Sequence, residues 1–331
     1  MESLLDVQGL SVEYRNLSGT VYAVNDLSFS LEPGEVLGLV GETGAGKTTT
    51  ALSILKLLPE GVGTITGGKI TLDGVDVTSA TEADMRALRG GIASMIFQDP
   101  MSSLNPSKTV GEQIYEILYI HNDKKNTKDE LNKKVDQIME LVGIHKERKN
   151  EYPHQFSGGM KQRIVIAIAL ACDPKLILAD EPTTALDVTI QAQVLALMTE
   201  LKQKLNTAMV FITHDLGIVA QMCQKVAVMY AGMLVEYGEV EKIFDQDILH
   251  PYTKGLFGAI PKINEDSKRL VPIDGMMPDP TVKMKGCPFA ERCTRKSEKC
   301  STQKTEMYEV APGHKIRCFL YENYTGGNYR E

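Results

Sequence analysis

The sequence lacks a segment that could enter a membrane by itself. The N-terminal stretch MESLLDVQGLSVEY contains Glu2 and Asp6 and has neither a basic region nor a long apolar run, so it does not resemble a secretory signal. The longest apolar run, residues 164–172, lies between Arg163 and Asp173 and has about half the length needed to span a bilayer. We therefore expect a cytoplasmic chain that reaches a membrane only through a partner.

Excess positive charge is also lacking. The 331 residues carry a formal net charge of −7, which argues against a protein that binds nucleic acid over its whole surface. The composition, 43% hydrophobic and 24% charged, is typical of a globular protein. The length allows either one large domain with an appendage or two domains.

Cysteine is scarce, with six residues in the chain. A disulfide framework is not expected, because the cytoplasm keeps thiols reduced. Four of the six lie within the last 45 residues, which indicates a metal site. The other two, Cys172 and Cys223, lie in apolar helical patterns and are expected in the core.

Hydrophobic patterns predict a mixed α/β protein. Alternating stretches near the N-terminus predict strands of a mostly antiparallel sheet. Continuous apolar runs at 36–40, 175–180 and 208–213 predict buried parallel strands. Residues 109–146 have helical spacing, interrupted by a lysine-rich stretch that we expect to be solvated. From about residue 246 the pattern fades, which predicts an irregular arm.

A glycine-rich stretch indicates phosphate binding. GETGAGKTT has the spacing G-x-x-x-x-G-K-T, follows an apolar run and precedes a helical pattern. In this setting glycines let backbone N–H groups surround phosphates, and the helix N-terminus adds its positive end. We expect Lys47 to neutralise the β- and γ-phosphates of ATP and Thr48 to bind Mg²⁺. The predicted nucleotide-binding residues of this loop are Gly41, Glu42, Thr43, Gly44, Ala45, Gly46, Lys47, Thr48 and Thr49.

The stretch LILADEPTTALD would complete such a site. A buried strand that ends at Asp180 puts a carboxylate beside the phosphate loop, where it can hold Mg²⁺ through water. Glu181 can polarise the attacking water as a general base. Without the loop, an acidic pair at a strand end would more often serve as a helix cap or an ion-pair partner.

FSGGMKQR, residues 156–163, resembles the L-S-G-G-Q signature of ABC-type ATPases. From the residues alone, Ser157, Gly158 and Gly159 open a helix whose N-terminus can receive an anion. The resemblance implies that the signature closes over ATP held by a facing subunit, so that two ATP molecules lie between two ATPase subunits. Two positions depart from the signature: Phe156 replaces Leu, and Met160 replaces Gln and removes a hydrogen-bonding side chain.

The resemblance implies further roles. Gln98 in IFQDP matches the glutamine that contacts Mg²⁺ and the attacking water and links the site to a transmembrane partner. Asp187 in TALD would lie at the seam between the two ATPase subunits. His214 in ITHDL matches the histidine that contacts the γ-phosphate. For the aromatic residue that stacks on adenine we choose Tyr14, with Tyr22 as the alternative.

The resemblance covers about residues 4–245 and also implies the fold. This is an α/β, RecA-like ABC-type P-loop ATPase core with an antiparallel β subdomain and a helical subdomain inserted at about residues 98–160. Residues 1–245 would form the nucleotide-binding domain. Residues 246–331 would form a C-terminal extension that carries the cysteine-rich arm.

The stretches FQDPMSSLNPSKTVGEQI and HPYTKGLFGAIP resemble the subgroup that energises uptake of dipeptides and oligopeptides, with relatives that handle nickel and glutathione. The implied partners are a second ABC ATPase subunit, two transmembrane permease subunits and an extracytoplasmic peptide-binding protein, and no nucleic acid. The chain would lie on the cytoplasmic side of the cell membrane as a peripheral subunit. An ABC ATPase acting on DNA or ribosomes is the alternative, but such proteins generally carry coiled-coil insertions or two cassettes.

The last four cysteines have the spacing C-x5-C-x6-C-x17-C, without the close pairs typical of structural zinc sites. Four thiolates on a loop-rich segment suit a 4Fe-4S cluster, and the segment resembles the one reported in peptide-importer ATPases. Residues 283–304 carry seven Lys or Arg against two Glu, which favours thiolates, although basic residues here could simply be solvated. Zinc and free thiols remain the alternatives. The predicted cluster ligands are Cys287, Cys293, Cys300 and Cys318.

Overall fold

The computed structural model describes residues 3–17, 19–122, 125–184, 186–244, 248–259 and 273–324. The chain divides into two compact units. Unit 1 comprises Met1–Leu5, Leu31–Val36 and Thr71–Ile212. Unit 2 comprises Asp6–Ser30, Leu37–Ile70 and Thr213–Glu331.

Three parallel strands form the sheet of unit 1. β7 (Leu176–Asp180) pairs in parallel with β6 (Ala93–Ile96) and with β8 (Ala208–Thr213). Every residue of β7 and β8 is buried. A parallel strand covered on both faces has a continuous apolar sequence, so the prediction of buried parallel strands at 175–180 and 208–213 is confirmed.

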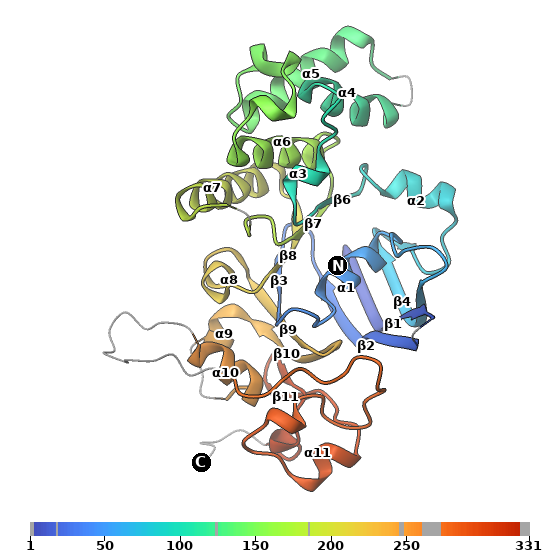
Figure 1. Cartoon of the computed structure of the whole chain (residues 1–331), viewed down its shortest axis with the longest axis vertical. Coiled ribbons are helices and arrows are strands. Elements are labelled where there is room, and N and C mark those ends of the chain that lie inside the picture. Colours follow the sequence, from blue (N-terminus) through green and yellow to red (C-terminus); the bar gives the residue numbers. More distant parts are fainter. Residues whose placement is uncertain are drawn as a thin grey trace. The chain divides into compact units, whose positions relative to one another are not determined.

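The helices of unit 1 begin at capping residues that the sequence supplies. Thr109 and Thr127 each accept a hydrogen bond from the third backbone N–H of the helix, and the carboxylates of Glu112 and Glu130 accept one from the backbone N–H of the capping threonine. The predicted helical pattern over 109–146 is therefore confirmed as two helices, and Figure 1 shows α4, α5 and α6 gathered together. The helices are α2 (Glu82–Leu88), α3 (Pro100–Ser103), α4 (Val110–Ile120), α5 (Lys128–Leu141), α6 (Gly158–Leu170) and α7 (Val188–Leu205).

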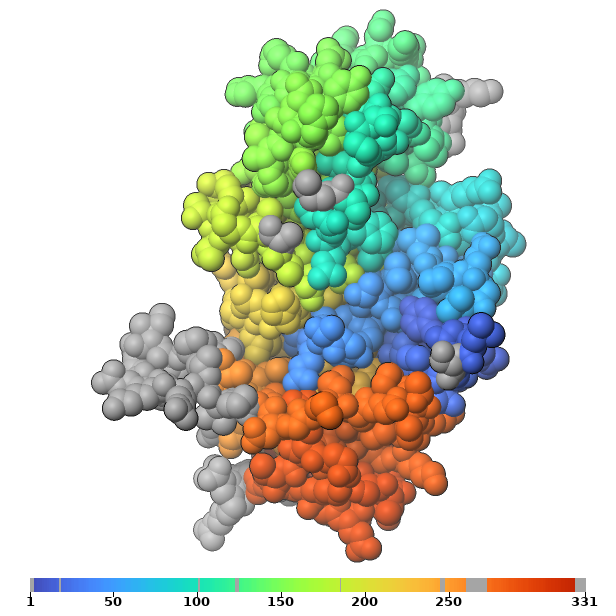
Figure 2. Space-filling model, in the orientation of Figure 1, coloured from blue at the N-terminus to red at the C-terminus, as the bar shows by residue number. Residues whose placement is uncertain are grey.

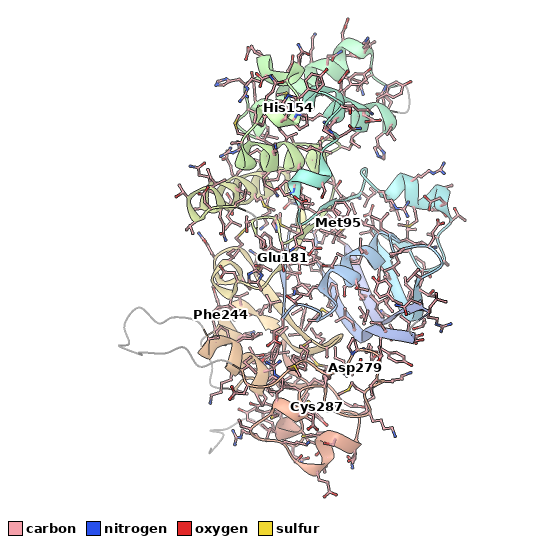
Figure 3. All side chains as sticks on the ribbon, viewed as in Figure 1. Met95, His154, Glu181, Phe244, Asp279 and Cys287 are labelled. Carbon is pink, nitrogen blue, oxygen red and sulfur yellow. The ribbon has the colours of Figure 1, made fainter. Side chains whose placement is uncertain are left out.

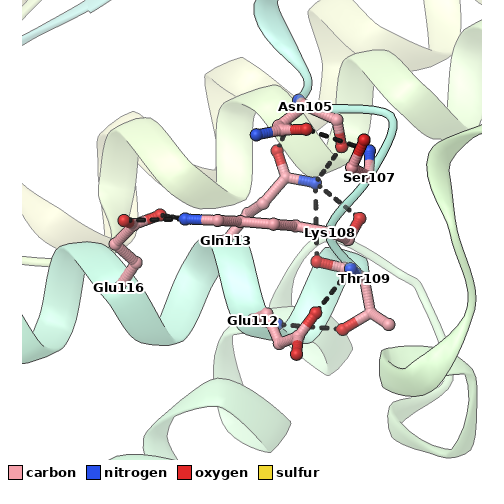
Figure 4. Close-up of polar contacts among 7 residues, drawn as sticks. All are labelled: Asn105, Ser107, Lys108, Thr109, Glu112, Gln113 and Glu116. Atoms are coloured by element: carbon pink, nitrogen blue, oxygen red, sulfur yellow. Dashed lines mark hydrogen bonds and ion pairs between the residues drawn. The ribbon is translucent and has the colours of Figure 1, made fainter.

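Gln113 ties the loop before α4 to the helix itself (Figure 4). Its Oε1 accepts a hydrogen bond from the Asn105 N–H at 2.9 Å, and its Nε2 donates to the carbonyls of Asn105 and Lys108, each at 3.1 Å. Lys108 also pairs with Glu116 at 2.7 Å. A buried amide that bonds to several backbone groups fixes a loop, so α4 orders the chain that follows Gln98.

A four-stranded sheet contains the N-terminal strands. Its order is β2 (Gly19–Leu31), β1 (Leu5–Asn16), β4 (Gly63–Leu72) and β5 (Val75–Asp76). The strands predicted from alternating patterns are therefore present. The last pair, β4 with β5, is antiparallel.

A second group of strands in unit 2 supports the phosphate loop. β3 (Val36–Val40) is fully buried, as predicted, and pairs in parallel with β9 (Lys225–Tyr230). β9 pairs antiparallel with β10 (Met233–Glu239), which pairs antiparallel with β12 (His314–Ile316). β11 (Tyr308–Ala311) completes the group beside β12.

The expectation of an irregular arm after residue 246 is partly wrong. HPYTKGLFG forms α10 (Pro251–Gly258), because His250 accepts a hydrogen bond from the Tyr252 N–H and proline fits the first turn. β12 extends the sheet of β10, and residues 273–324 make a compact, continuous surface in Figure 2. The remaining helices of unit 2 are α1 (Lys47–Ile54), α8 (Leu216–Met222), α9 (Val240–Phe244) and α11 (Glu298–Thr302). No helix of the described segments is both long enough and apolar enough to cross a membrane.

Candidate nucleotide site and cysteine cavity

The phosphate loop joins β3 to α1 and needs its glycines. Gly41, Gly44 and Gly46 have φ angles of 154°, 82° and 96°, in the region that glycine tolerates best. A Cβ on Gly41 would collide with the Met229 carbonyl oxygen, and one on Gly46 would collide with that of Ala23. A Cβ on Gly44 would meet no atom of the described chain nearby. The loop is therefore tightly packed at Gly41 and Gly46, where backbone of other segments lies against it, and open at Gly44.

Lys47, the predicted phosphate-binding lysine, is the first residue of α1 and is 6% exposed. Its ammonium donates to the carbonyls of Gly41 at 2.8 Å and Glu42 at 3.1 Å. Thr48, the predicted Mg²⁺ ligand, is exposed beside it. The loop thus folds back around the lysine and leaves the threonine accessible.

Tyr14 and Tyr22 differ in their surroundings. The Tyr14 hydroxyl donates to Thr49 Oγ1 at 3.2 Å, so this ring lies beside the start of α1. Tyr22 instead contacts the C-terminal part of unit 2, with Lys283 Nζ at 5.6 Å from the centre of its ring. Its backbone N–H donates to the Pro280 carbonyl at 2.8 Å. This difference favours Tyr14, the first choice, as the residue near a bound nucleotide.

The carboxyl end of β7 brings two predicted catalytic residues together. Gln98 Nε2 donates to Glu181 Oε2 at 3.1 Å, across 83 positions of sequence. Thr184 Oγ1 donates to the same oxygen at 2.9 Å, a contact that the sequence did not predict. Glu181, labelled in Figure 3, has a φ of 45°, which is uncommon for a residue with a side chain. Asp180 is the last residue of the strand and is 3% exposed.

His214 follows the last residue of β8 directly and is exposed. The next residue, Asp215, caps α8 by accepting hydrogen bonds from the N–H groups of Gly217 and Ile218 at 2.8 and 3.3 Å. The cap fixes the backbone around His214 while the imidazole remains accessible. Its predicted contact with a phosphate stays a prediction.

The signature segment opens α6. Ser157 caps this helix, and its Oγ accepts a hydrogen bond from the Met160 N–H at 3.4 Å. Ser157 and Gly158 are exposed, whereas Gly159 is buried, and a Cβ on Gly159 would collide with Ile190. The helix N-terminus is therefore accessible, as an anion site requires.

The two departures from the signature contact the same arginine. The guanidinium of Arg148 lies 4.2 Å from the ring centre of Phe156 and 3.5 Å from the Met160 sulfur. Arg148 also pairs with Glu151 at 2.6 Å. Phe156 and Met160 therefore form part of a small cluster that supports the start of α6.

Asp187 caps α7, and its Oδ1 accepts a hydrogen bond from the Ile190 N–H at 3.0 Å. The carboxylate is exposed. Because capping uses only one of its oxygens here, the group could still contact a second subunit. That role stays a prediction.

The four C-terminal cysteines line one cavity of about 210 Å³. Figure 3 labels Cys287 within the C-terminal part of the chain. Burial raises the pKa of Cys287 to about 11 and that of Cys318 to about 12, and it also raises the pKa of Cys293. Arg295 and Lys299 line the same cavity. The predicted ligands are therefore gathered, although burial without a bound cation favours neutral thiols.

His250 also lines this cavity and is 1% exposed. Its Nδ1 accepts a hydrogen bond from the Tyr252 N–H at 3.1 Å, whereas its Nε2 has no hydrogen-bond partner. Burial lowers the pKa of His250 to about 3, so the ring is neutral and Nε2 carries the proton. An unpaired buried donor in the wall suits an anionic occupant.

No three or more His, Cys, Asp or Glu side chains of the described residues converge closely enough to hold a single metal ion. The zinc alternative therefore has no support, and the 4Fe-4S prediction gains none from this criterion. The two remaining cysteines lie elsewhere: Cys223 is in the core as predicted, but Cys172 is only partly buried.

Arg292 connects the cysteine segment to the phosphate loop, which the sequence did not predict. Its guanidinium pairs with the Glu42 carboxylate at 2.8 and 3.2 Å, and its side chain is 6% exposed. The expectation that basic residues of this segment are simply solvated is therefore wrong for Arg292. No local sequence pattern predicts a contact between residues that are 250 positions apart.

Comparison with known proteins identifies the class to which this loop and signature belong. A family model described as "ABC transporter" matches residues 24–184, and one described as "Oligopeptide/dipeptide transporter, C-terminal region" matches residues 235–300. The structure also resembles that of cbiO1 from Clostridium perfringens, part of the ABC transporter complex cbiONQ. The TM-score is 0.64 at 28% identity, over 74% of this chain and 92% of the other.

Two curated relatives indicate which group of ABC transporter proteins the chain resembles. The chain is 47% identical to the dipeptide transport ATP-binding protein DppD of Bacillus subtilis, over 97% of this chain and 96% of that protein. It is 46% identical to the oligopeptide transport ATP-binding protein OppD of Escherichia coli, over 96% and 93%. The chain thus belongs to the ABC transporter family, among the dipeptide and oligopeptide transport ATP-binding proteins. The predicted family and the ABC ATPase fold, with its α/β core, are confirmed.

Proposed function

We propose that this chain hydrolyses ATP as a subunit of a membrane transporter that imports dipeptides or oligopeptides. The observation that carries the proposal is the hydrogen bond between Gln98 and Glu181 at the end of a buried strand. This bond joins Gln98, the candidate contact to Mg²⁺ and the attacking water, to Glu181, the candidate general base. The full-length similarity to peptide-transport ATP-binding proteins favours this function over an ATPase that acts on DNA or ribosomes, and over nickel or glutathione import.

The proposed chemistry needs Mg²⁺ and a positioned water. Thr48, Gln98 and Asp180 would hold the Mg²⁺ of MgATP, directly or through water, and the metal would offset charge on the phosphates. Glu181 would take the proton of the attacking water, a step that typically contributes about 10²–10⁴-fold to a rate. His214 would contact the γ-phosphate.

The remaining nucleotide contacts are also proposals. Residues 41–49 would surround the phosphates, and Tyr14 would stack on adenine. Ser157, Gly158 and Gly159 would complete the site of a facing ATPase subunit, with Asp187 at the seam. The accessible N-terminus of α6 supports this arrangement, because an exposed helix start attracts anions.

The proposed assembly contains a second ATPase subunit, two permease subunits and an external peptide-binding protein. The chain would lie peripherally on the cytoplasmic face of the membrane. Residues 1–245 would act as the nucleotide-binding domain with a helical subdomain at about 98–160, and residues 246–331 as the C-terminal extension with its cysteine-rich arm. The helices α3 to α6 support such a subdomain.

Capture of the tagged chain from membranes tests the transport function. We expect two permeases and a second ATPase to co-purify, and ATP turnover by the complex to rise when a peptide-loaded binding protein is added. The Lys47→Met variant should assemble equally well but lose ATP binding, because its ammonium is replaced by an apolar group. Recovery of ribosomes or DNA in place of permeases would contradict the proposal.

We also propose that the cysteine cavity holds a 4Fe-4S cluster. The support is the gathering of four thiols around a shared cavity, with Arg295, Lys299 and the His250 Nε2 donor in its wall. The four cysteines also lack the close pairs typical of structural zinc sites, and four thiols on a loop-rich segment suit a group of several irons. When bound, such a group would supply a cross-link among the thiols and a redox-active centre.

Iron and acid-labile sulfide analysis of anaerobically purified chain tests the cluster. We expect about four of each per chain, and a loss of both in the Cys300→Ser variant. The Cys223→Ser variant is the matched control, because Cys223 is buried away from the cavity and should keep the iron. A colourless protein with one zinc per chain would contradict the proposal.

A further inference from the structure

We propose that Arg292 is a positioning residue for the phosphate loop. By pairing with Glu42, it holds this carboxylate in a fixed position and neutralises its charge beside the triphosphate. This inference rests on the proposed ATP-binding function of residues 41–49. It gives the segment between Cys287 and Cys293 a direct influence on nucleotide affinity.

The pairing is bidentate and largely shielded from solvent. Arg292 Nη1 lies 2.8 Å from one Glu42 carboxylate oxygen, and Nη2 lies 3.2 Å from the other. The arginine side chain is 6% exposed and the glutamate side chain 28%. Two parallel charge-assisted bonds fix both distance and orientation, which a single contact of a flexible lysine would not do.

Other contacts hold Arg292 in place independently of Glu42. Its Nε donates to the Asp274 carbonyl and its Nη2 to the Ile273 carbonyl, both at 2.9 Å, while Nη1 also donates to the Tyr230 hydroxyl at 3.2 Å. Burial opposes the charge of Arg292, but the bonds to Glu42 and Tyr230 raise its pKa. The guanidinium is therefore a fixed, fully charged group that pairs with the Glu42 carboxylate of the loop.

A second contact from the same region reaches the same loop residue. The Tyr252 hydroxyl accepts a hydrogen bond from the Glu42 N–H at 2.9 Å. The Tyr252 ring lies 4.7 Å from that of Tyr230 and 5.4 Å from that of Phe289, which is itself in the wall of the cysteine cavity. Both the backbone and the side chain of Glu42 are thus held by residues near the cavity.

Backbone hydrogen bonds fix the start of the segment that carries Arg292. The Cys287 N–H donates to the Cys300 carbonyl at 2.8 Å, and the Ala290 N–H donates to the Cys287 carbonyl at 3.1 Å. The short helical turn Ala290–Arg292 ends directly before Cys293. Arg292 is thus the residue directly before one cysteine of the cavity and five residues after another.

The charge of Glu42 determines whether ATP affinity falls or recovers in the variants. Without Arg292, Glu42 would present an unpaired carboxylate to a triphosphate that carries several negative charges, so ATP binding should weaken. Removing the Glu42 charge as well should restore much of the affinity, because the repulsion is gone. A purely structural defect would not be repaired by a second loss of contact.

The experiment measures MgATP binding to the purified full chain by isothermal titration calorimetry at one fixed salt concentration. The variants are Arg292→Met, Glu42→Gln and the double variant. Lys296→Met is the matched control, because Lys296 lies four residues after Arg292 but pairs on the surface with Glu291. We expect Arg292→Met to bind ATP about tenfold more weakly, which corresponds to ~1.4 kcal/mol. The double variant should bind within about threefold of the wild type, and Lys296→Met as the wild type does.

Wild-type affinity in Arg292→Met would overturn the inference, and so would a double variant that binds no better than Arg292→Met. If Arg292→Met does not fold, Arg292→Lys replaces it, with a smaller loss that Glu42→Gln again repairs. Failure of the wild-type chain to bind ATP would instead contradict the proposed function, so the two failures are distinguishable.

Discussion

Replacing Tyr252 with Phe tests how firmly the C-terminal part of unit 2 holds the phosphate loop. The Tyr252 side chain is fully buried, and its hydroxyl accepts the Glu42 N–H at 2.9 Å. Phe preserves the ring and removes only the oxygen. A typical hydrogen bond contributes about 1 kcal/mol net, and because Glu42 is only partly buried, water can replace the lost partner. We therefore expect the free energy of unfolding to fall by about 1 kcal/mol.

The same bond sets the expected change in nucleotide affinity. If the bond forms only when the loop has its ATP-binding shape, its loss weakens ATP binding by up to about fivefold, the factor that corresponds to ~1 kcal/mol. Urea unfolding measures the stability, and calorimetric titration with MgATP measures the affinity.

Tyr321→Phe is the matched control for Tyr252→Phe. Tyr321 is also buried, and its hydroxyl donates to the Leu249 carbonyl at 2.8 Å, a contact that does not involve the loop. Its loss should lower stability by at least as much, because this bond is buried, and should leave ATP affinity unchanged. Equal affinity losses in the two variants, or an unchanged affinity in Tyr252→Phe, would refute the reasoning.

Three further predictions concern other parts of the chain. Gly46→Ala should lose ATP binding, because its Cβ would collide with backbone, whereas Gly61→Ala, also at positive φ but in open space among the described residues, should cost only about 1 kcal/mol in urea unfolding. Burial raises the pKa of Cys223 to about 12; the unfolded chain ionises this thiol from about pH 9, so stability should fall by roughly 1.4 kcal/mol at pH 10 relative to Cys223→Ala. An equal pH dependence in both would contradict this. Arg148→Ala should lower ATP turnover of the assembled complex several-fold but leave ATP binding by the isolated chain unchanged, with exposed Arg86→Ala as the control that keeps full turnover.

Local patterns predicted the elements that local physics determines. The strand at 36–40 was predictable because a strand buried on both faces needs a continuous apolar run. Helices α4 and α5 were predictable because the stretch 109–146 has helical spacing of its apolar residues, and the capping boxes at Thr109 and Thr127 fix where the two helices begin. The phosphate loop was predictable because its glycines have no substitute at such backbone angles.

Contacts between distant residues could not be predicted in the same way. β12 is only three residues long, and it is a strand because β10 provides an edge with which it pairs. Arg292 resembles its basic neighbours in the sequence, and only the tertiary structure sets it apart by pairing it with Glu42.

The most direct test of the central claim is ATP turnover by the Glu181→Gln variant in the complete complex purified with its membrane partners. Gln keeps the size of the side chain and can still pair with Gln98 and Thr184, but it cannot accept a proton from water. We predict that turnover falls by at least about a hundredfold, the lower range for loss of a general base, while MgATP binding is retained. Turnover close to that of the wild type would contradict the account.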